Sequence, residues 1–209
     1  EIMKSDIPTY QGGSFKTALY VHPDPKVGRP FKNPTRMCFR DFFFLFDVPF
    51  EYGGPWPAAA EKGPDALVVL SDETNQKVFG GQNSVGQRLR IEDRDFIVVG
   101  VLKPWVPRPK YYDPHNGTFE PPEGLYLPFE MFRLLKVRSA GNTSNWKPFN
   151  WDNWDEYLAS EAVWIQMWVQ LDTREQRDSY MAFLNSYVQS QKELGRMLRP
   201  TNNKLLPVM

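Results

Sequence analysis

The alternation of apolar and polar residues is most regular in residues 162–171, which read AVWIQMWVQL. Apolar residues at every second position predict a strand with a core face and a mixed face. The expected core face consists of Val163, Ile165, Met167, Val169 and Leu171. The expected mixed face consists of Trp164, Gln166, Trp168 and Gln170.

A helical period follows this strand directly. Asp172 and Glu175 match a capping box, in which both side chains satisfy backbone N–H groups that the first helical turn leaves free. Apolar residues then recur at helical spacing for about six turns, and Gly195 ends the pattern. We expect this helix to pack on a sheet. Its stripe, apolar except for one glutamine, consists of Tyr180, Phe183, Leu184, Tyr187, Val188, Gln191 and Leu194.

The middle of the chain predicts a strand, a helix and a hairpin in close succession. Residues 66–70 (ALVVL) have the pattern of a buried strand. Ser71 then caps a helix, because its side chain can accept from a free backbone N–H group of the first turn. The helix is expected to end at Gly80 and Gly81. Residues 86–102 form two alternating segments around a tight polar turn, which predicts a β-hairpin.

Shorter elements are expected elsewhere. Phe15–His22 has the composition of a strand. Asn33 followed by Pro34 is typical of an N-cap and a first helical position, so residues 33–48 are expected to contain a helix. A further short helix is expected over Phe129–Val137.

The glycines after residue 80 nearly match the phosphate-binding pattern G-x-x-x-x-G-K-[ST]. A nucleotide loop follows a strand and precedes a helix, because the helix N-terminus supplies the amide donors. Here the glycines follow a helix and precede a strand, and Gln87 stands where the pattern requires lysine. We therefore expect Gly81 and Gly86 to end a helix and turn the chain into a hairpin.

Composition narrows the class of protein. Lys+Arg and Asp+Glu each total 25, which disfavours a nucleic-acid partner. Cys38 is the single cysteine of the sequence, lies among aromatic residues and is expected to be a buried thiol. His22 and His115 are isolated in proline-rich segments, so no metal site is expected. The chain starts at Glu1 and has no apolar run of the about 20 residues that span a bilayer, so we expect an excised domain.

A longer motif covers the same helix and hairpin. The matching residues are Val68-Val69-Leu70-Ser71, Val78-Phe79-Gly80-Gly81, Val85-Gly86, Leu89, Ile91, Phe96, Val98 and Gly100-Val101. In this order the chain resembles the extracytoplasmic, periplasmic domain of MacB-type ABC transporter permeases, which are related to the FtsX family. The resemblance covers residues 40–132 well and the closing strand and helix more loosely.

The resemblance implies an α+β fold in two parts. Residues 1–38 and 160–209 would form a porter-like β-α sandwich from both chain ends, with the N-terminal part truncated. Residues 39–159 would form a small inserted α/β subdomain that contains the strand, helix and hairpin. Its structural motif would consist of Ser71, Phe79, Gly80, Gly81, Val85, Gly86, Phe96 and Gly100.

The resemblance also implies a non-catalytic role, without a cofactor or metal in this domain. A separate cytoplasmic ABC ATPase domain or subunit would hydrolyse ATP. The domain would engage a cargo or a periplasmic adaptor protein and relay the motion of the transmembrane helices. The parent chain would be an inner-membrane protein of a bacterium and would act as a permease dimer, while a monomeric state of the isolated domain stays open.

A different class of protein fits the segment NWKPFNWDNWDEYL. Trp146, Trp151 and Trp154 lie near acidic residues there, a combination that a carbohydrate- or ligand-binding module uses for stacking. The same tryptophans would also serve to fill a join between subdomains, which we favour, or to anchor a partner protein.

A hydrolase would depend on an acidic pair, either Asp113 with Glu120 or Asp152 with Asp155. These residues lie in polar loops, where carboxylates are usually solvated. The chain also contains neither H-E-x-x-H nor G-x-S-x-G. We therefore expect a protein without catalytic residues.

Overall fold

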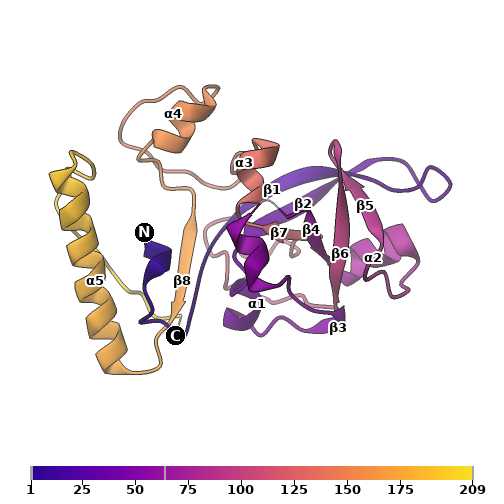
Figure 1. The fold of residues 1–209 in the computed structure, drawn as a ribbon, viewed down its shortest axis with the longest axis horizontal. Coiled ribbons are helices and arrows are strands. Elements are labelled where there is room, and N and C mark those ends of the chain that lie inside the picture. Colours follow the sequence, from indigo (N-terminus) through magenta and orange to yellow (C-terminus); the bar gives the residue numbers. More distant parts are fainter. Residues whose placement is uncertain (1, 64, 209) are drawn as a thin grey trace.

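The computed structural model describes residues 2–63 and 65–208, and its strands and helices confirm the predicted α+β class (Figure 1). The strands are β1 (Tyr10–His22), β2 (Phe31–Cys38), β3 (Phe50–Gly53), β4 (Leu67–Leu70), β5 (Arg88–Ile91), β6 (Arg94–Leu102), β7 (Leu125–Pro128) and β8 (Gln166–Gln170). The α-helices are α1 (Phe42–Leu45), α2 (Asp72–Phe79), α3 (Met131–Leu135), α4 (Trp154–Ala159) and α5 (Arg174–Glu193). Two short 3-10 helices are η1 (Ile2–Lys4) and η2 (Ala58–Lys62).

Most of the strands close into a ring. Strand β2 is followed in hydrogen-bonded order by β7, β4, β6, β5 and β1, and β1 pairs back with β2. A closed ring leaves no free strand edge between these members, and free edges are the template for unwanted pairing with other chains. Strands β3 and β8 lie outside the ring, paired with β6 and with the first part of β1.

Successive residues of the ring strands point to two different hydrophobic cores. In β4, Val68 and Leu70 belong to the first core and Val69 belongs to the second. The first core takes buried residues from every strand of the ring, so it fills the interior of the ring. The second core contains Trp56 and residues of α1, outside the ring. The predicted buried strand over residues 66–70 is therefore confirmed, and it is apolar throughout because both of its faces are covered.

The helix predicted within residues 33–48 does not start at Asn33 and Pro34. Phe31–Cys38 is strand β2, and only Phe42–Leu45 is α-helical. Asn33 is not a helix cap, because its Nδ2 donates to the Oγ1 of Thr74 at 2.9 Å. The Asn-Pro pair is a local helix signal, but β2 has hydrogen-bonded neighbours on both sides, β1 and β7. Such long-range pairing overrides local propensity.

The predicted core face of residues 162–171 is confirmed only in part, because Ile165 packs against the first core but so does Trp164 of the opposite face. Regular strand is confined to β8, and Val163 and Met167 are 54% and 41% exposed. Trp164 and Trp168, on the face predicted to be mixed, pack against the two hydrophobic cores. Strand β8 pairs along one edge with β1. The large indole rings therefore decide which face is covered, because they bury more area than the aliphatic residues opposite them.

Helix α5 begins one residue later than predicted. Thr173, not Asp172, is its N-cap, and the capping box is completed by Gln176 rather than Glu175. The sequence contains two possible capping boxes, Asp172 with Glu175 and Thr173 with Gln176, which are offset by one residue. The carboxylate of Asp172 is instead engaged by the hydroxyl of Thr9, so the contact with the N-terminal segment selects between the two patterns.

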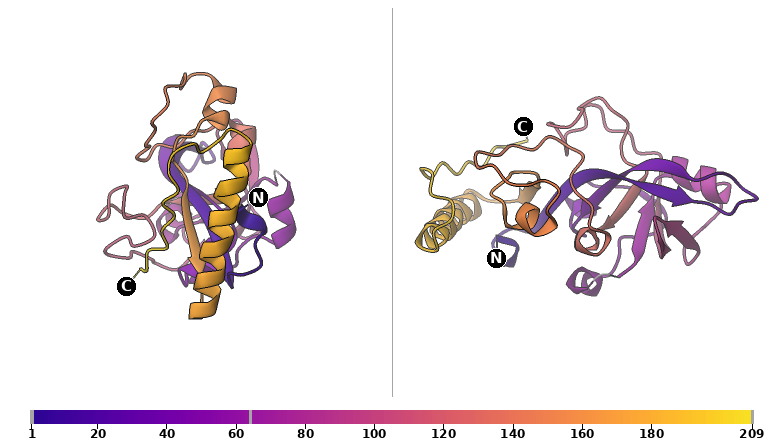
Figure 2. Two further views of the ribbon diagram at one scale, coloured as in Figure 1. Left: turned by 90° about the vertical axis from the view of Figure 1, so that its left-hand side faces the viewer. Right: turned by 90° about the horizontal axis from the view of Figure 1, so that it is seen from above.

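Helix α5 lies beside η1 and β8, away from the ring (Figures 1 and 2). Tyr180 and Gln191 are buried in its stripe, whereas Leu194 is 69% exposed. The Nε2 of Gln176 donates to the carbonyl of Ile7 at 3.1 Å, and the chain after α5 runs back along the helix (Figure 2). The stripe is therefore half-covered by the two chain ends and not by a broad sheet. In the described part of the chain, no helix combines the length and apolar character that a bilayer span requires.

The predicted division into residues 1–38 with 160–209 and residues 39–159 stays a prediction. Hydrogen-bonded ladders cross this division, because β1 pairs with β5 and β2 pairs with β7. The two predicted parts therefore share one sheet.

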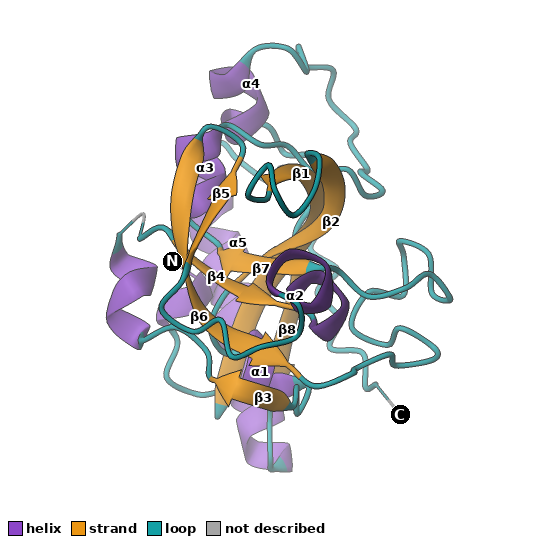
Figure 3. Cartoon of the chain, turned by 90° about the vertical axis from the view of Figure 1, so that its right-hand side faces the viewer, coloured by secondary structure: helices purple, strands orange, loops and turns teal. Residues whose placement is uncertain are grey.

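Helix α2 begins and ends where the sequence predicts, at the end of the molecule shown in Figure 3. The Oγ of Ser71 accepts from the backbone N–H of Thr74 at 3.1 Å. Gly80 ends the helix in the left-handed conformation at φ +67°. Phe79 and Phe96 pack in the first core. The predicted helix boundaries are therefore confirmed.

The loop from α2 to β5 is ordered by Asn75. Its Nδ2 donates to the carbonyl of Gln82 at 3.0 Å, and its Oδ1 accepts from the hydroxyl of Ser84 at 2.6 Å. The N–H of Gly86 donates to the carbonyl of Val98 at 2.8 Å. This loop follows a helix and uses its polar groups internally, so its glycines act in chain turning, as the sequence predicts.

We predict that Gly100→Ala destabilises the fold more than Gly86→Ala. A Cβ at Gly100 would lie 2.5 Å from the carbonyl oxygen of Gly54 and 2.7 Å from the ring of Phe50, whereas a Cβ at Gly86 meets open space. Gly86 has φ +86°, so its substitution should cost about 1 kcal/mol of backbone strain. Overpacking at Gly100 should cost roughly 2–3 kcal/mol. Urea unfolding of the two variants measures the difference, and equal losses would contradict the prediction.

Candidate functional site

Four charged side chains are buried where β2 meets the loop of residues 103–124. Arg36 belongs to β2, and Lys110, Asp113 and Glu123 belong to the loop, and each is at most 1% exposed. We call these residues the buried charge cluster. Its two cations balance its two carboxylates, and burial of charge is tolerable only when each charge is paired and hydrogen-bonded.

Glu123 makes contacts through both carboxylate oxygens. Its Oε1 accepts from the Nη2 of Arg36 at 2.7 Å and lies 3.0 Å from the Nζ of Lys110. Its Oε2 accepts from the hydroxyl of Tyr112 at 2.9 Å. The guanidinium of Arg36 also lies 4.9 Å from the centroid of the Tyr112 ring, a cation–π distance. Glu123 therefore fixes the loop against β2.

Asp113 extends the cluster to β8. Its carboxylate is paired with Arg36 and accepts from the Nε2 of Gln166 in β8 at 2.6 Å. The Nδ2 of Asn116 donates to the same carboxylate at 2.6 Å, and Arg36 also donates to the hydroxyl of Ser14 in β1 at 3.1 Å. The cluster therefore joins β1, β2, β8 and the long loop.

Opposing effects set the pKa values in this cluster. Burial alone would raise the pKa of Glu123, but the charges and hydrogen bonds of Arg36 and Lys110 outweigh burial and lower that pKa to about 2. Burial would lower the pKa of Arg36, but Glu123 and Asp113 raise it above its ordinary value. Burial is also the main cause of the raised pKa of Tyr112. The ionised carboxylate, the guanidinium and the neutral phenol are therefore the stable forms at neutral pH.

The cluster is built to hold chain segments together, because its carboxylates are already engaged and shielded from solvent. Asp113 is one of the residues on which the hydrolase hypothesis depends. Its predicted partner Glu120 instead forms a surface ion pair with Lys16 at 2.5 Å. Asp152 and Asp155 are exposed near the start of α4, as expected for solvated loop residues.

Cys38 is fully buried, as predicted, and burial raises the pKa of its thiol well above the ordinary value. His22 lies at the end of β1 and His115 lies in the long loop. Among residues 2–63 and 65–208, no group of three or more His, Cys, Asp or Glu side chains is placed to hold a metal ion.

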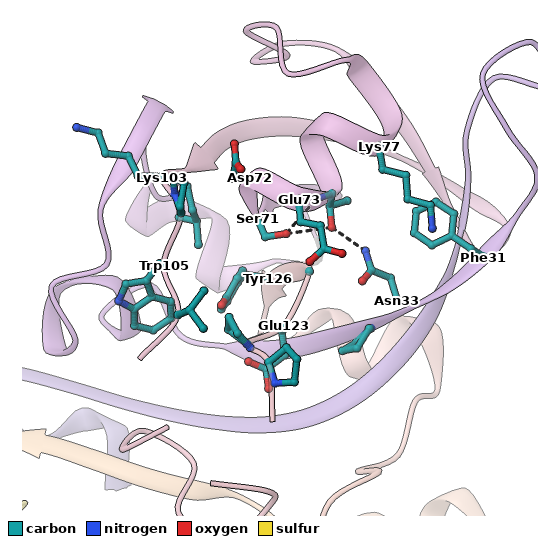
Figure 4. A pocket seen from close by; sticks show the side chains of 18 of the residues that line it. Phe31, Asn33, Ser71, Asp72, Glu73, Lys77, Lys103, Trp105, Glu123 and Tyr126 are labelled. Atoms are coloured by element: carbon teal, nitrogen blue, oxygen red, sulfur yellow. Dashed lines mark hydrogen bonds between the residues drawn. The ribbon is translucent and has the colours of Figure 1, made fainter. Parts of the chain in front are cut away.

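An open cavity of about 530 Å³ lies between the start of α2, the start of β2 and the two ends of the long loop (Figure 4). Phe31 and Trp105 contribute aromatic surface to its wall. The Nζ of Lys77 lies 3.4 Å from the centroid of the Phe31 ring. The hydrogen bonds drawn in Figure 4 connect wall residues with one another, including Asn33 with Thr74. The cavity therefore has walls that are fixed by their own contacts.

The predicted tryptophan surface divides into an exposed and a covered part. Trp146 and Trp151 are 43% and 41% exposed. Trp154 is half-buried, and its ring centroid lies 6.0 Å from that of Phe132. The Nε1 of Trp146 donates to Glu161 at 3.2 Å. Trp154 thus fills a join between α4 and α3, while a ligand or partner surface formed by these tryptophans stays a prediction.

No local pattern in the sequence predicts the buried charge cluster. Arg36 falls in the segment that local signals assign to a helix. Lys110 and Glu123 lie in a proline-rich loop, where charged residues are usually solvated. One signal was available: ordered loops longer than about 12–15 residues are uncommon and need anchors of their own. That signal indicates an anchor without indicating which residues form it.

The ring and its flanking α/β units have the fold of extracytoplasmic domains of ABC transporters. The structure is similar to the periplasmic region of MacB from Actinobacillus actinomycetemcomitans, with a TM-score of 0.57 and 12% identity over 96% of this chain and 81% of that one. It is also similar to the extracellular domain of the noncanonic ABC-type transporter YknZ from Gram-positive bacteria. There the TM-score is 0.53 and the identity 12%, over 86% of this chain and 73% of that one.

A match to the sequence identifies the family of this chain. The model of the MacB-like periplasmic core domain matches residues 14–187. The chain therefore belongs to the family of MacB-like periplasmic core domains, and the resemblance drawn from the motif is confirmed. A comparison with curated proteins finds no match.

We predict that Arg36→Met strongly destabilises the domain. The variant leaves Asp113 and Glu123 buried without their main counter-charge, which should cost about 3–5 kcal/mol. Lys16→Met is the matched control, because it removes the surface pair with Glu120 and should cost about 1 kcal/mol or less. Chemical denaturation at pH 7 measures both losses. Losses of similar size would show that the cluster is not a special support of the fold.

We predict a loss of stability in acid that depends on Glu123. The pKa of Glu123 is lowered from 4.5 to about 2, so its contribution is complete above pH 4.5 and disappears as the pH falls through about 2. The contribution should amount to roughly 3 kcal/mol of unfolding free energy. Denaturation between pH 5 and pH 2 should show this fall in the unmodified domain and a flatter profile in Glu123→Gln. Parallel profiles would refute the assignment.

Proposed function

We propose that this chain is the periplasmic domain of an ABC transporter permease and acts without catalysis, by engaging a partner or cargo and relaying motion of the transmembrane helices. The observation that carries the proposal is the match of the MacB-like periplasmic core domain to residues 14–187. The similar folds of the periplasmic region of MacB and the extracellular domain of YknZ support the same context.

A relay requires a body that moves as one piece. Close-packed interiors resist deformation, so a closed ring of strands transmits displacement better than an open sheet with loose flanks. The buried charge cluster adds a link between the ring and β8, because Asp113 binds both Arg36 and Gln166. Movement of β8 would therefore carry the long loop and the ring with it.

The proposal assigns the chemistry to other parts of the transporter. ATP would be hydrolysed by a cytoplasmic ATPase domain or subunit, and no cofactor would bind in this domain. The parent chain would be an inner-membrane protein of a bacterium, working as a permease dimer. A periplasmic adaptor protein is one candidate partner, and the cargo is not specified by the proposal.

The gene that encodes the chain tests this assignment. We predict an apolar stretch of about 20 residues shortly before Glu1 and three more after Met209. Sequencing the flanking regions, followed by membrane fractionation of the full product, checks the prediction. A full product that lacks such stretches and stays in the soluble fraction would refute the proposed function.

A further inference from the structure

The β1–β2 hairpin projects from the ring, and its tip lies at the far end of the molecule from both chain termini (Figures 1 and 2). The turn joins His22 to Phe31, and residues 24–30 are all exposed. We call residues 24–30 the hairpin tip. The structure therefore presents a short segment to the surroundings, well away from the rest of the domain.

The hairpin tip is held in one conformation by its own contacts. The carbonyl of Asp24 accepts from the N–H groups of Val27 and Gly28 at 2.8 Å and 3.1 Å. The carboxylate of Asp24 accepts from the N–H of Lys26 at 2.8 Å. Pro25 and Pro30 restrict the backbone further. A pre-ordered loop loses little conformational entropy on binding, which favours recognition.

The base of the hairpin is also fixed. Val21 pairs with Phe31 across the hairpin and with Ile91 of β5. Lys77 of α2 packs on the ring of Phe31. The backbone of Tyr20 is bonded to Glu92 in the β5–β6 turn. The tip therefore has a defined position relative to the ring, although it projects from it.

The chemistry of the tip combines one apolar side chain with unpaired cations. Val27 is 56% exposed. Lys26 and Arg29 flank it, and Lys32 follows at the start of β2. In the described part of the chain Lys26, Arg29 and Lys32 form no ion pair. The one carboxylate of the tip, that of Asp24, accepts from the backbone N–H of Lys26 and not from a cationic side chain.

We infer that the hairpin tip is a docking surface for a protein partner that presents carboxylates around a shallow apolar recess. Val27 would enter the recess, while Lys26 and Arg29 would meet the carboxylates at its rim. A few residues near the centre of an interface supply most of its binding energy, and arginine is common among them. Complementary charges also set specificity and the rate of association. This inference rests on the proposed function, because it supplies the surface on which that partner would bind.

A protein fits the tip better than a lipid surface does. Segments that bind anionic lipid carry clusters of about four to eight basic residues, so three cations and one valine would give only weak attachment. If the chain ends lead to membrane anchors, the tip is also directed away from the membrane. A partner in the periplasm therefore matches both the chemistry and the position of the tip.

The test uses the full-length permease in the cells that it comes from. The photo-crosslinking residue p-benzoylphenylalanine replaces Val27 or, as a control, Val163, which is exposed to a similar extent, 54% against 56%. We expect a specific protein adduct at position 27 and none at position 163. Reversal of both charges of the tip, in Lys26→Glu with Arg29→Glu, should abolish the adduct. The matched control reverses two charges on α5, in Arg174→Glu with Arg177→Glu, and should leave the adduct unchanged.

The captured protein is then purified, and its affinity for the full-length permease is measured. Charge reversal at the tip should weaken binding at least tenfold, and exchanging the facing carboxylates of the partner for lysines should restore it. Retained affinity in the reversed variant, or no adduct at position 27, would overturn the inference. Sedimentation with anionic phospholipid vesicles that depends on Lys26 and Arg29 would overturn it in favour of a lipid surface. The proposed function fails separately, through the absence of flanking apolar stretches.

Discussion

The salt bridge between Arg36 and the two carboxylates of the long loop is the interaction on which the rest of the structure depends. Residues 103–124 contain no regular element, so their path is set by anchors and not by a hydrogen-bonded ladder. Arg36 provides that anchor from within the ring, and only one residue, Gly124, separates Glu123 from β7. The position of the loop therefore also determines where β7 enters between β2 and β4. Removal of one partner would leave the others charged and unpaired inside the protein, so each member of the cluster depends on the rest.

The ring explains how a chain with many loops keeps a defined shape. Its interior is filled from every member strand, and its outer face is covered by α1 and the aromatic residues around Trp56. Parts that lie outside the ring, such as α5 and the segment that follows it, are covered less completely. The structure thus combines a rigid centre with more lightly attached ends. That arrangement would suit the relay of motion proposed above.

Local patterns identified much of the fold but little of the cluster. The boundaries of α2 and the β5–β6 hairpin follow from a cap, a terminating glycine and alternating residues, all of which act within a few positions. The same local reasoning failed for β2, because Asn33 and Pro34 resemble a helix start while the strand is stabilised by two distant neighbours. It was only partly right for residues 162–171, where Trp164 and Trp168 of the predicted mixed face pack against the two cores as well. Arg36 and Glu123 could not be paired from the sequence, since 87 positions separate them and neither carries a local sign of burial.

Strand β1 takes part in three ladders, with β8, β2 and β5. The insertion or deletion of one residue within β1 would move every later side chain of the strand to the opposite face of the sheet. It would also change the pairing register with the neighbouring strands. Natural variation in length among relatives should therefore be rare inside this strand. It should accumulate instead in the turn that follows this strand, so that evolution can reshape what the domain touches while its frame stays constant.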